Sequence, residues 1–183
     1  NLCDDTHCQA FNGYSSDAVI YRAALETKDL VIVAKDSTLI VAAFHSNCGG
    51  ETASSEDVWL TGHSYLERVT DPYCLISRNA VWEKLIKRAD WIASLRRSGY
   101  SEDKEMPETF NFIQDSRKTD YKTGALSVPL RNIRTDLDLR STFFSVTENN
   151  GSIILNGKGY GHGVGLCQEG AMVMALKGFK FHQ

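Results

Sequence analysis

The chain has 183 residues, enough for one domain with a sizeable core, and its 42% hydrophobic and 23% charged residues are typical of a globular protein. Its net charge of -3 and pI near 6.0 come without the clustered Lys/Arg footprint of nucleic-acid-binding domains, so DNA and RNA are excluded as partners. The longest apolar runs, such as residues 39–44, fall far short of the roughly 18 residues of a membrane-spanning helix, so no membrane span is expected.

In the first half of the chain, the sequence patterns predict a helix, a hairpin and a longer helical region. Residues 16–26 place apolar side chains near helical spacing after Ser16, a suitable N-cap. Residues 30–34 and 38–45 are rich in β-branched side chains on either side of a turn and predict a β-hairpin. Apolar stripes in residues 79–97 predict a helix in two pieces.

The second half of the chain alternates further strands and helices. Strands are predicted at residues 109–114, 124–128, 142–147 and 152–155, and helices at residues 129–139 and 166–177. Asn149-Asn150-Gly151 predicts a hairpin turn, because Asn and Gly accept positive φ. Hairpins and helices without regular βαβ alternation indicate the α+β class. We therefore expect a single domain with β-hairpins in a mixed, mainly antiparallel sheet and several short helices around a substrate groove.

The first segment with chemical potential is Cys3-Asp4-Asp5-Thr6-His7-Cys8-Gln9. Cys3, His7 and Cys8 are of the residue types that bind zinc, and a structural zinc site would need a fourth ligand from elsewhere in the chain. The same two cysteines could instead close a small disulfide loop or remain thiols. The sequence leaves open one structural zinc or a disulfide here, and it indicates no organic cofactor.

The second segment surrounds the dipeptide Gly49-Gly50, which follows a predicted strand. Two successive glycines allow backbone conformations that other residues do not hold, and such a turn exposes the neighbouring side chains. Hydroxyl, amide and aromatic side chains gathered beside it suit a sugar polymer, which needs hydrogen bonds and flat apolar faces. The alternative is a purely structural turn with Trp59 in the core.

The third segment, residues 157–165, has glycine at every second position around Tyr160 and His162. It lacks the Lys-Ser/Thr ending of a P-loop, and no βαβ unit follows it as a dinucleotide fingerprint would require. A backbone without Cβ atoms lets a ligand or another segment approach closely. The alternative is a tight packing joint between a strand and the last helix.

Taken together, the three segments resemble the SpoIID/LytB family, named for stage II sporulation protein D. The first is similar to the family's Cys-Asp-x-x-His-Cys-Gln, and residues 45–66 to its His-x-x-x-Gly-Gly-x-Thr, Val-Trp and Tyr-Leu motifs. Residues 159–171 are similar to its Gly-Tyr-Gly-His-Gly-Val-Gly-x-x-Gln-x-Gly-Ala. The resemblance identifies residues 1–183 as a SpoIID-like peptidoglycan-active domain, apparently without its N-terminal segment and extreme C-terminus.

The resemblance implies a lytic transglycosylase that cleaves peptidoglycan glycan strands and leaves anhydro-muramoyl ends. One glutamic acid suffices, because the muramoyl 6-hydroxyl of the substrate acts as the nucleophile, whereas ordinary glycosidases need two carboxylates. The family's acid precedes the Cys-Asp motif and therefore lies upstream of Asn1, so the chain alone is expected to be inactive or nearly so. Glu169 and Glu51 are the replacement candidates.

Two other functions remain open from the sequence. One is a non-catalytic peptidoglycan-binding or amidase-enhancing module, and the other a metal-dependent hydrolase built on Cys3, His7 and Cys8. The resemblance implies a cell-envelope, extracytoplasmic location, with glycan strands and possible other cell-wall hydrolases as partners. It also implies substrate-binding roles in one groove for His45, Thr52, Tyr65, His162 and Gln168.

The remaining cysteines lead to a further expectation. A disulfide between Cys48 and Cys74 would close a loop of about 26 residues, worth roughly 3 kcal/mol on the chain-entropy model. It would hold the Thr52–Tyr65 region against the hairpin, and an envelope location would supply the oxidising setting. Cys167 is expected to be a buried thiol on the last helix.

Overall fold

The structure is a computed structural model that describes residues 13–59, 61–101 and 103–182. The chain separates after Ile40 into two compact units, each considered by itself below. The predicted ligands Cys3, His7 and Cys8 lie outside the described residues. Within the described ranges, no helix is long and apolar enough to cross a bilayer.

In its described part, residues 13–40, the first unit contains a helix and a tight turn between Val33 and Leu39. Helix α1, Ala18–Glu26, begins at the N-cap Asp17, whose carboxylate accepts a hydrogen bond of 2.7 Å from the Val19 N–H. The predicted hairpin is reduced here to a single antiparallel bridge between Val33 and Leu39. The last residues of the predicted second strand instead belong to a strand of the other unit, so the hairpin prediction was wrong beyond its turn.

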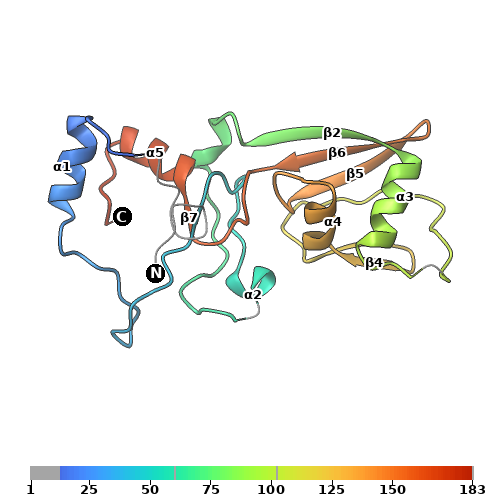
Figure 1. Cartoon of the computed structure of the whole chain (residues 1–183), viewed down its shortest axis with the longest axis horizontal. Helices are drawn as coiled ribbons and strands as arrows, with labels where there is room; N and C mark the ends of the chain where they lie inside the picture. Colours follow the sequence, from blue (N-terminus) through green and yellow to red (C-terminus); the bar gives the residue numbers. More distant parts are fainter. Residues whose placement is uncertain (1–12, 60, 102, 183) are drawn as a thin grey trace. The chain divides into compact units, whose positions relative to one another are not determined.

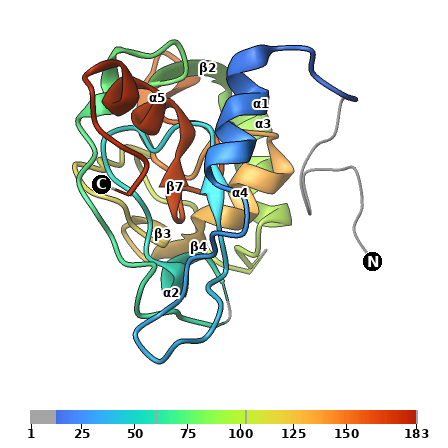
Figure 2. The same ribbon diagram turned by 90° about the vertical axis from the view of Figure 1, so that its left-hand side faces the viewer.

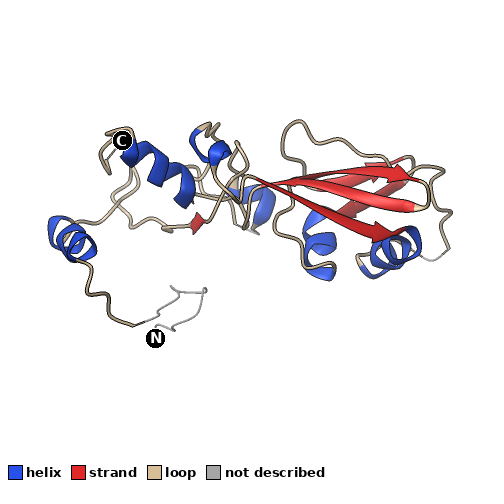
Figure 3. Cartoon of the chain, turned by 90° about the horizontal axis from the view of Figure 1, so that it is seen from above, coloured by secondary structure: helices blue, strands red, loops and turns tan. Residues whose placement is uncertain are grey.

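In its described residues, the second unit, 41–183, has its strands in three small sheets, and Figures 1 and 3 show how these strands are arranged. The largest is antiparallel, with the strand order β2-β6-β5: β2 Val81–Lys87, β6 Ser152–Lys158 and β5 Phe144–Asn149. The second pairs β3 Asp120–Thr123 with β4 Leu126–Pro129, also antiparallel. The third pairs β1 Phe44–His45 with β7 Leu166–Cys167 in parallel.

Short helices accompany these sheets. They are α2 Ser55–Val58, the 3₁₀ helix η1 Tyr73–Ile76, α3 Arg88–Arg97, α4 Leu130–Asp136 and α5 Gln168–Leu176. Figure 2 shows β7 running directly into α5. The predicted α+β class with mainly antiparallel pairing is confirmed, and among the described residues every named strand belongs to the unit of residues 41–183.

Residues 79–97 were predicted as helix throughout, which was wrong for the first half. Val81–Lys87 is strand β2, paired along its whole length with β6. Its side chains alternate between exposed Leu85 and buried Ile86, as the period of a strand requires. Short apolar runs fit both periods, and the partner strand about 70 residues later decides between them. The predicted strand at 109–114 is similarly limited to one bridge, between Phe112 and Val146.

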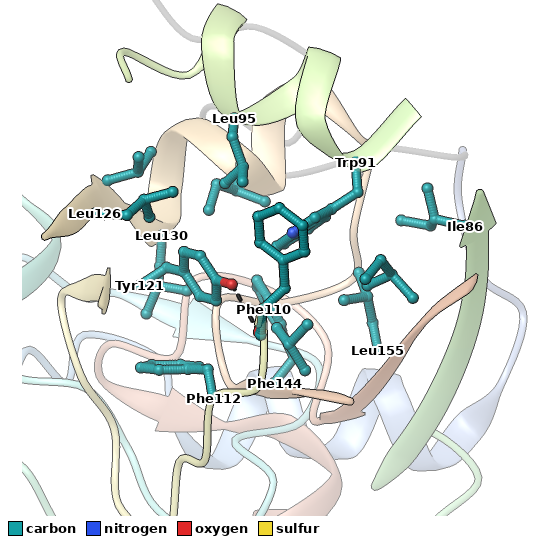
Figure 4. Close-up of a cluster of buried hydrophobic side chains, with 14 of the residues drawn as sticks. Ile86, Trp91, Leu95, Phe110, Phe112, Tyr121, Leu126, Leu130, Phe144 and Leu155 are labelled. Atoms are coloured by element: carbon teal, nitrogen blue, oxygen red, sulfur yellow. Dashed lines mark hydrogen bonds between the residues drawn. The ribbon is translucent and has the colours of Figure 1, made fainter. Parts of the chain in front are cut away.

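The core of this unit lies between the larger sheet and helices α3 and α4 (Figure 4). The Trp91 and Tyr121 rings meet edge to face with their centroids 5.4 Å apart, and the Phe112 ring lies 5.1 Å from that of Tyr121. The Tyr121 hydroxyl donates a hydrogen bond of 2.7 Å to the Phe110 carbonyl, so this buried phenol has a partner. Burial raises the pKa of Tyr121 and keeps it neutral.

Trp82 of β2 lies over its cross-strand partner Gly157 in β6. A Cβ atom at position 157 would lie 1.9 Å from Cε2 of the Trp82 ring. The ring is held by a hydrogen bond of 3.2 Å from its Nε1 to the Ser141 hydroxyl and by contact with Phe144. Glycine at 157 is therefore required by this indole and not by its own backbone conformation.

We predict that Gly157→Ala lowers the free energy of unfolding by about 1–3 kcal/mol, because the added methyl group overpacks the indole site. In a Trp82→Ala background, the same substitution should cost nothing or stabilise slightly. Chemical denaturation of the four proteins of this double-mutant cycle measures the coupling. Equal costs in both backgrounds would contradict the proposed contact.

Candidate functional site

The glycine-rich segment packs directly against the chain around β1. Gly161 has φ +113 and Gly163 φ +85, conformations that L side chains rarely adopt. A Cβ at Gly161 would lie 2.8 Å from the Cβ of His45, and one at Gly163 would lie 2.8 Å from Cζ of Arg117. The glycine-rich segment is therefore a tight packing joint against the chain around β1, and we call it the glycine joint. This joint places two histidines side by side.

Arg117 is the cation that holds this joint together. Its Nε donates to the Glu51 carbonyl at 2.7 Å, and one terminal nitrogen donates to the Cys48 carbonyl at 2.7 Å. The guanidinium also lies 4.9 Å from the centroid of the Phe143 ring. Burial lowers the pKa of Arg117 to about 10, so the group remains charged at neutral pH. None of the three sequence segments contains Arg117, so no local pattern indicated its role.

His45 and His162 meet at the joint with ring centroids 5.7 Å apart. Buried His45 has its Nδ1 3.0 Å from the Val164 carbonyl, which makes Nδ1 the protonated nitrogen and Nε2 the bare one. The Nδ1 of His162 accepts a hydrogen bond of 3.0 Å from the Val164 N–H. Burial lowers the pKa of His45 to about 4 and also lowers that of His162, so both rings are neutral at pH 7.

A row of rings extends from these histidines to the protein surface. Trp59 lies 5.8 Å from His162 and 6.4 Å from His63, and His63 lies 5.3 Å from Tyr65, all measured between ring centroids. The Tyr65 hydroxyl accepts a hydrogen bond of 3.0 Å from the Val41 N–H. Trp59 and His63 are half-buried and Tyr65 is exposed, so the row presents ring surface to a ligand.

A pocket of about 270 Å³ adjoins the row at His162. Ala53 and Thr142 contribute to its wall, and the cations Arg131 and Arg134 line it together with the buried Arg117. Lys118 adds a fourth cation, and the carboxylates of Asp57 and Asp120 also line the pocket, so the cations outnumber the acids and the pocket can accept an acidic, partly apolar ligand. Of the predicted substrate-binding residues, only His162 lines this pocket.

The other predicted residues have different surroundings. Thr52 is buried, and its hydroxyl accepts a hydrogen bond of 2.8 Å from the Val69 N–H and faces the Glu67 carbonyl at 3.3 Å. It therefore anchors the segment before Cys74. Gln168 is exposed at the start of α5. Their roles in binding stay predictions, and the one groove expected to join all five residues is not formed by this pocket.

The arrangement of the cysteines differs from the predicted Cys48–Cys74 disulfide. Cys48, Cys74 and Cys167 are buried free thiols, with 3.4 Å between the Cys48 and Cys74 sulfurs. The predicted Cys48–Cys74 disulfide was therefore right about the neighbours and wrong about the bond, because a third sulfur and the Asp71 carboxylate share the site. Cys167 is buried as predicted, but it is the N-cap of α5. This Cys/Asp cluster could hold a metal ion.

Comparison with known proteins gives relatives that cover nearly the whole chain. It is 30% identical over 195 residues to stage II sporulation protein D of Bacillus subtilis, covering 97% of this chain and 55% of the relative. It is 27% identical over 228 residues to the amidase enhancer of Bacillus subtilis, covering 96% and 32%. It is 29% identical over 174 residues to an uncharacterized protein of Brachyspira hyodysenteriae, covering 93% and 47%. These relatives support a SpoIID/LytB-like family for this chain.

This SpoIID/LytB-like chain spans between about a third and just over half of the length of these relatives. No family model matches it. The resemblance seen in the three sequence segments is confirmed by the relatives, and two of those segments are the ones that meet at the glycine joint.

Glu169, the acid candidate within the SpoIID/LytB-like glycine segment, has both carboxylate oxygens engaged. One accepts from the Asn47 amide at 2.7 Å and the other from the Asn79 amide at 2.5 Å. Asn47 is itself fixed, because its Oδ1 accepts a hydrogen bond of 2.8 Å from the Gly49 N–H. Through these hydrogen bonds, Glu169 links α5 to the Gly-Gly turn.

We predict that Glu169→Gln lowers the free energy of unfolding by about 1.5–3 kcal/mol, because a glutamine amide would face one asparagine amide donor to donor. Thermal and denaturant unfolding measure the loss. Gln168→Ala, at the exposed neighbouring position, is the matched control and should change stability little. An unchanged stability of the Glu169→Gln protein would contradict this stabilising role of the two hydrogen bonds.

We also predict an acid-dependent loss of stability that arises from His45. Its folded pKa is about 4 against 6.5 for the unfolded chain, so the unfolded state binds the proton first as the pH falls. Stability is fully present above pH 6.5 and falls by up to about 3 kcal/mol on acidification towards pH 4. His45→Asn keeps a donor near Nδ1 and removes this titration. Parallel stability–pH curves for the two proteins would contradict the assignment.

Proposed function

We propose that the chain is the glycan-binding part of a SpoIID-like protein that acts on peptidoglycan in the cell envelope. Two of its relatives are named stage II sporulation protein D and amidase enhancer, and these names support a cell-wall function connected with sporulation. The observation that carries the proposal is the row of rings from His162 through Trp59 to Tyr65, beside a pocket lined by arginines.

The chemistry of this region suits a muramic-acid-containing strand. Half-buried Trp59 and exposed Tyr65 offer the flat faces on which sugar rings stack. Arg131 and Arg134 suit the lactyl or peptide carboxylate of muramoyl units, since guanidinium groups bind carboxylates in a planar fork. Neutral His162 can exchange hydrogen bonds with sugar hydroxyls.

We further propose that the parent protein cleaves the strand as a lytic transglycosylase. Glu169, the acid candidate of the glycine-rich segment, is committed to two asparagines, which leaves its carboxylate unsuited to act as the general acid. The chain alone is therefore expected to bind strands and to cleave them at rates lower by the roughly 10²–10⁴-fold that a general acid contributes. A structural zinc at Cys3, His7 and Cys8 remains a prediction of the sequence.

The second candidate function is amidase enhancement, in which the chain positions strands for another cell-wall hydrolase. The amidase enhancer among its relatives favours this alternative. The ring row serves both functions, so binding does not separate them. The reaction products separate the two functions. Anhydro-muramoyl ends indicate transglycosylation, and faster release of stem peptides by an added amidase indicates enhancement.

We predict that purified chain co-sediments with peptidoglycan sacculi and that Trp59→Ala and Tyr65→Ala each weaken this binding about fivefold, because a stacked ring contributes on the order of 1 kcal/mol. Phe181→Ala removes an exposed aromatic side chain outside the row and is the matched control. Circular dichroism confirms folding. Retained binding by both ring variants would refute the site.

A second measurement addresses cleavage. Sacculi incubated with the chain, and with the chain plus an amidase, are digested and analysed by mass spectrometry for anhydro-muropeptides. We expect no anhydro products above background from the chain alone. Their appearance at a rate that Glu51→Gln abolishes would place the acid within these residues and overturn the expectation.

A further inference from the structure

We propose that Cys48, Asp71, Cys74 and Cys167 form a structural zinc site, separate from the Cys3–Cys8 segment. Their three sulfurs and one carboxylate oxygen all lie within 4.8 Å of one another. Cys48 directly precedes Gly49-Gly50, and Asp71 lies just before η1. Cys74 lies within η1, and Cys167 is the N-cap of α5. The inference does not depend on the proposed glycan binding.

The separations fit one tetrahedral ion. Zinc–sulfur bonds of about 2.3 Å and zinc–oxygen bonds of about 2.0 Å place two sulfurs about 3.8 Å apart and a sulfur and an oxygen about 3.5 Å apart. The Cys48 sulfur lies 3.4 Å from the Cys74 sulfur and 3.3 Å from Oδ2 of Asp71. A disulfide would require about 2.0 Å and would leave a third thiol against it.

The surroundings of the cluster suit thiolate ligands. The N–H groups of Cys48 and Gly170 both point to the Cys167 sulfur at 3.4 Å, and this sulfur caps the positive end of α5. The Arg117 guanidinium donates to the Cys48 carbonyl beside it. These donors and charges offset the negative charge that three thiolates and a carboxylate bring to a divalent ion.

The Asp71 carboxylate is oriented as a ligand. Its Oδ1 accepts a hydrogen bond of 2.9 Å from the Tyr73 N–H, which leaves Oδ2 to face the sulfurs. A Cβ at position 170 would lie 2.2 Å from that Oδ2, so glycine in α5 makes room for the carboxylate. Replacement by any other residue would push Asp71 away from the cluster.

The three thiolates and one carboxylate indicate which ion binds and that its role is structural. Soft thiolates favour zinc over the oxygen-seeking magnesium and calcium ions. Four protein ligands fill the coordination of a tetrahedral ion, the three cysteines are at most 6% exposed and Asp71 is half-buried, so the site is of the structural kind. The ion would link η1, α5 and the Gly-Gly turn to one another.

The test isolates this site in a Cys3→Ser/Cys8→Ser protein, in which both thiol ligands of the other candidate site are removed. After purification with zinc and removal of loose metal, we expect one zinc per chain by elemental analysis, and Co²⁺ should give the absorption of a tetrahedral thiolate complex. Cys74→Ser and Cys167→Ser should each lose that equivalent, whereas Asp71→Cys should retain it.

Thiol labelling provides a readout that does not depend on whether the variants fold. In the same Cys3→Ser/Cys8→Ser protein, three thiols should resist a thiol reagent and become reactive when a chelator removes zinc, with a lower melting temperature. The proposal is overturned if this folded protein holds no zinc, or if its mass after denaturing alkylation is that of a Cys48–Cys74 disulfide.

Discussion

The buried guanidinium of Arg117 is the interaction on which the rest of the domain depends. A charge removed from water must be matched by hydrogen bonds and nearby polar atoms, and Arg117 meets this demand with the carbonyls of Cys48 and Glu51 and with the Phe143 ring. These partners fix the Gly-Gly turn against the second half of the domain. Gly163 is a glycine because the guanidinium occupies the space of a side chain.

The close approach at this joint determines the electrostatics of the candidate site. Packing without intervening side chains buries His45 and half-buries His162, and burial keeps both imidazoles neutral. Neutral rings extend the apolar row through Trp59 to the exposed Tyr65. The positive charge of the site comes instead from arginines at the neighbouring pocket. Stacking and carboxylate recognition are thus placed side by side.

Several polar motif residues serve the scaffold. Glu169 joins two asparagine amides, and the Thr52 hydroxyl holds the backbone of the segment that leads to Cys74. Both tie distant segments to the Gly-Gly turn, as the cysteine cluster also does. In this domain, therefore, the motif glycines permit close contact, and the motif polar groups secure it.

The sequence by itself determined what depends on neighbouring residues. The α+β class, α4 after Pro129, the β5–β6 hairpin around Asn150-Gly151 and the family follow from local patterns. Tertiary structure alone decided that Val81–Lys87 is a strand, that Arg117 is the central cation and that three sulfurs meet at Asp71. The physical reason is that strand pairing, burial and ligand clustering are contacts between distant segments, and a local pattern carries no information about which segments meet.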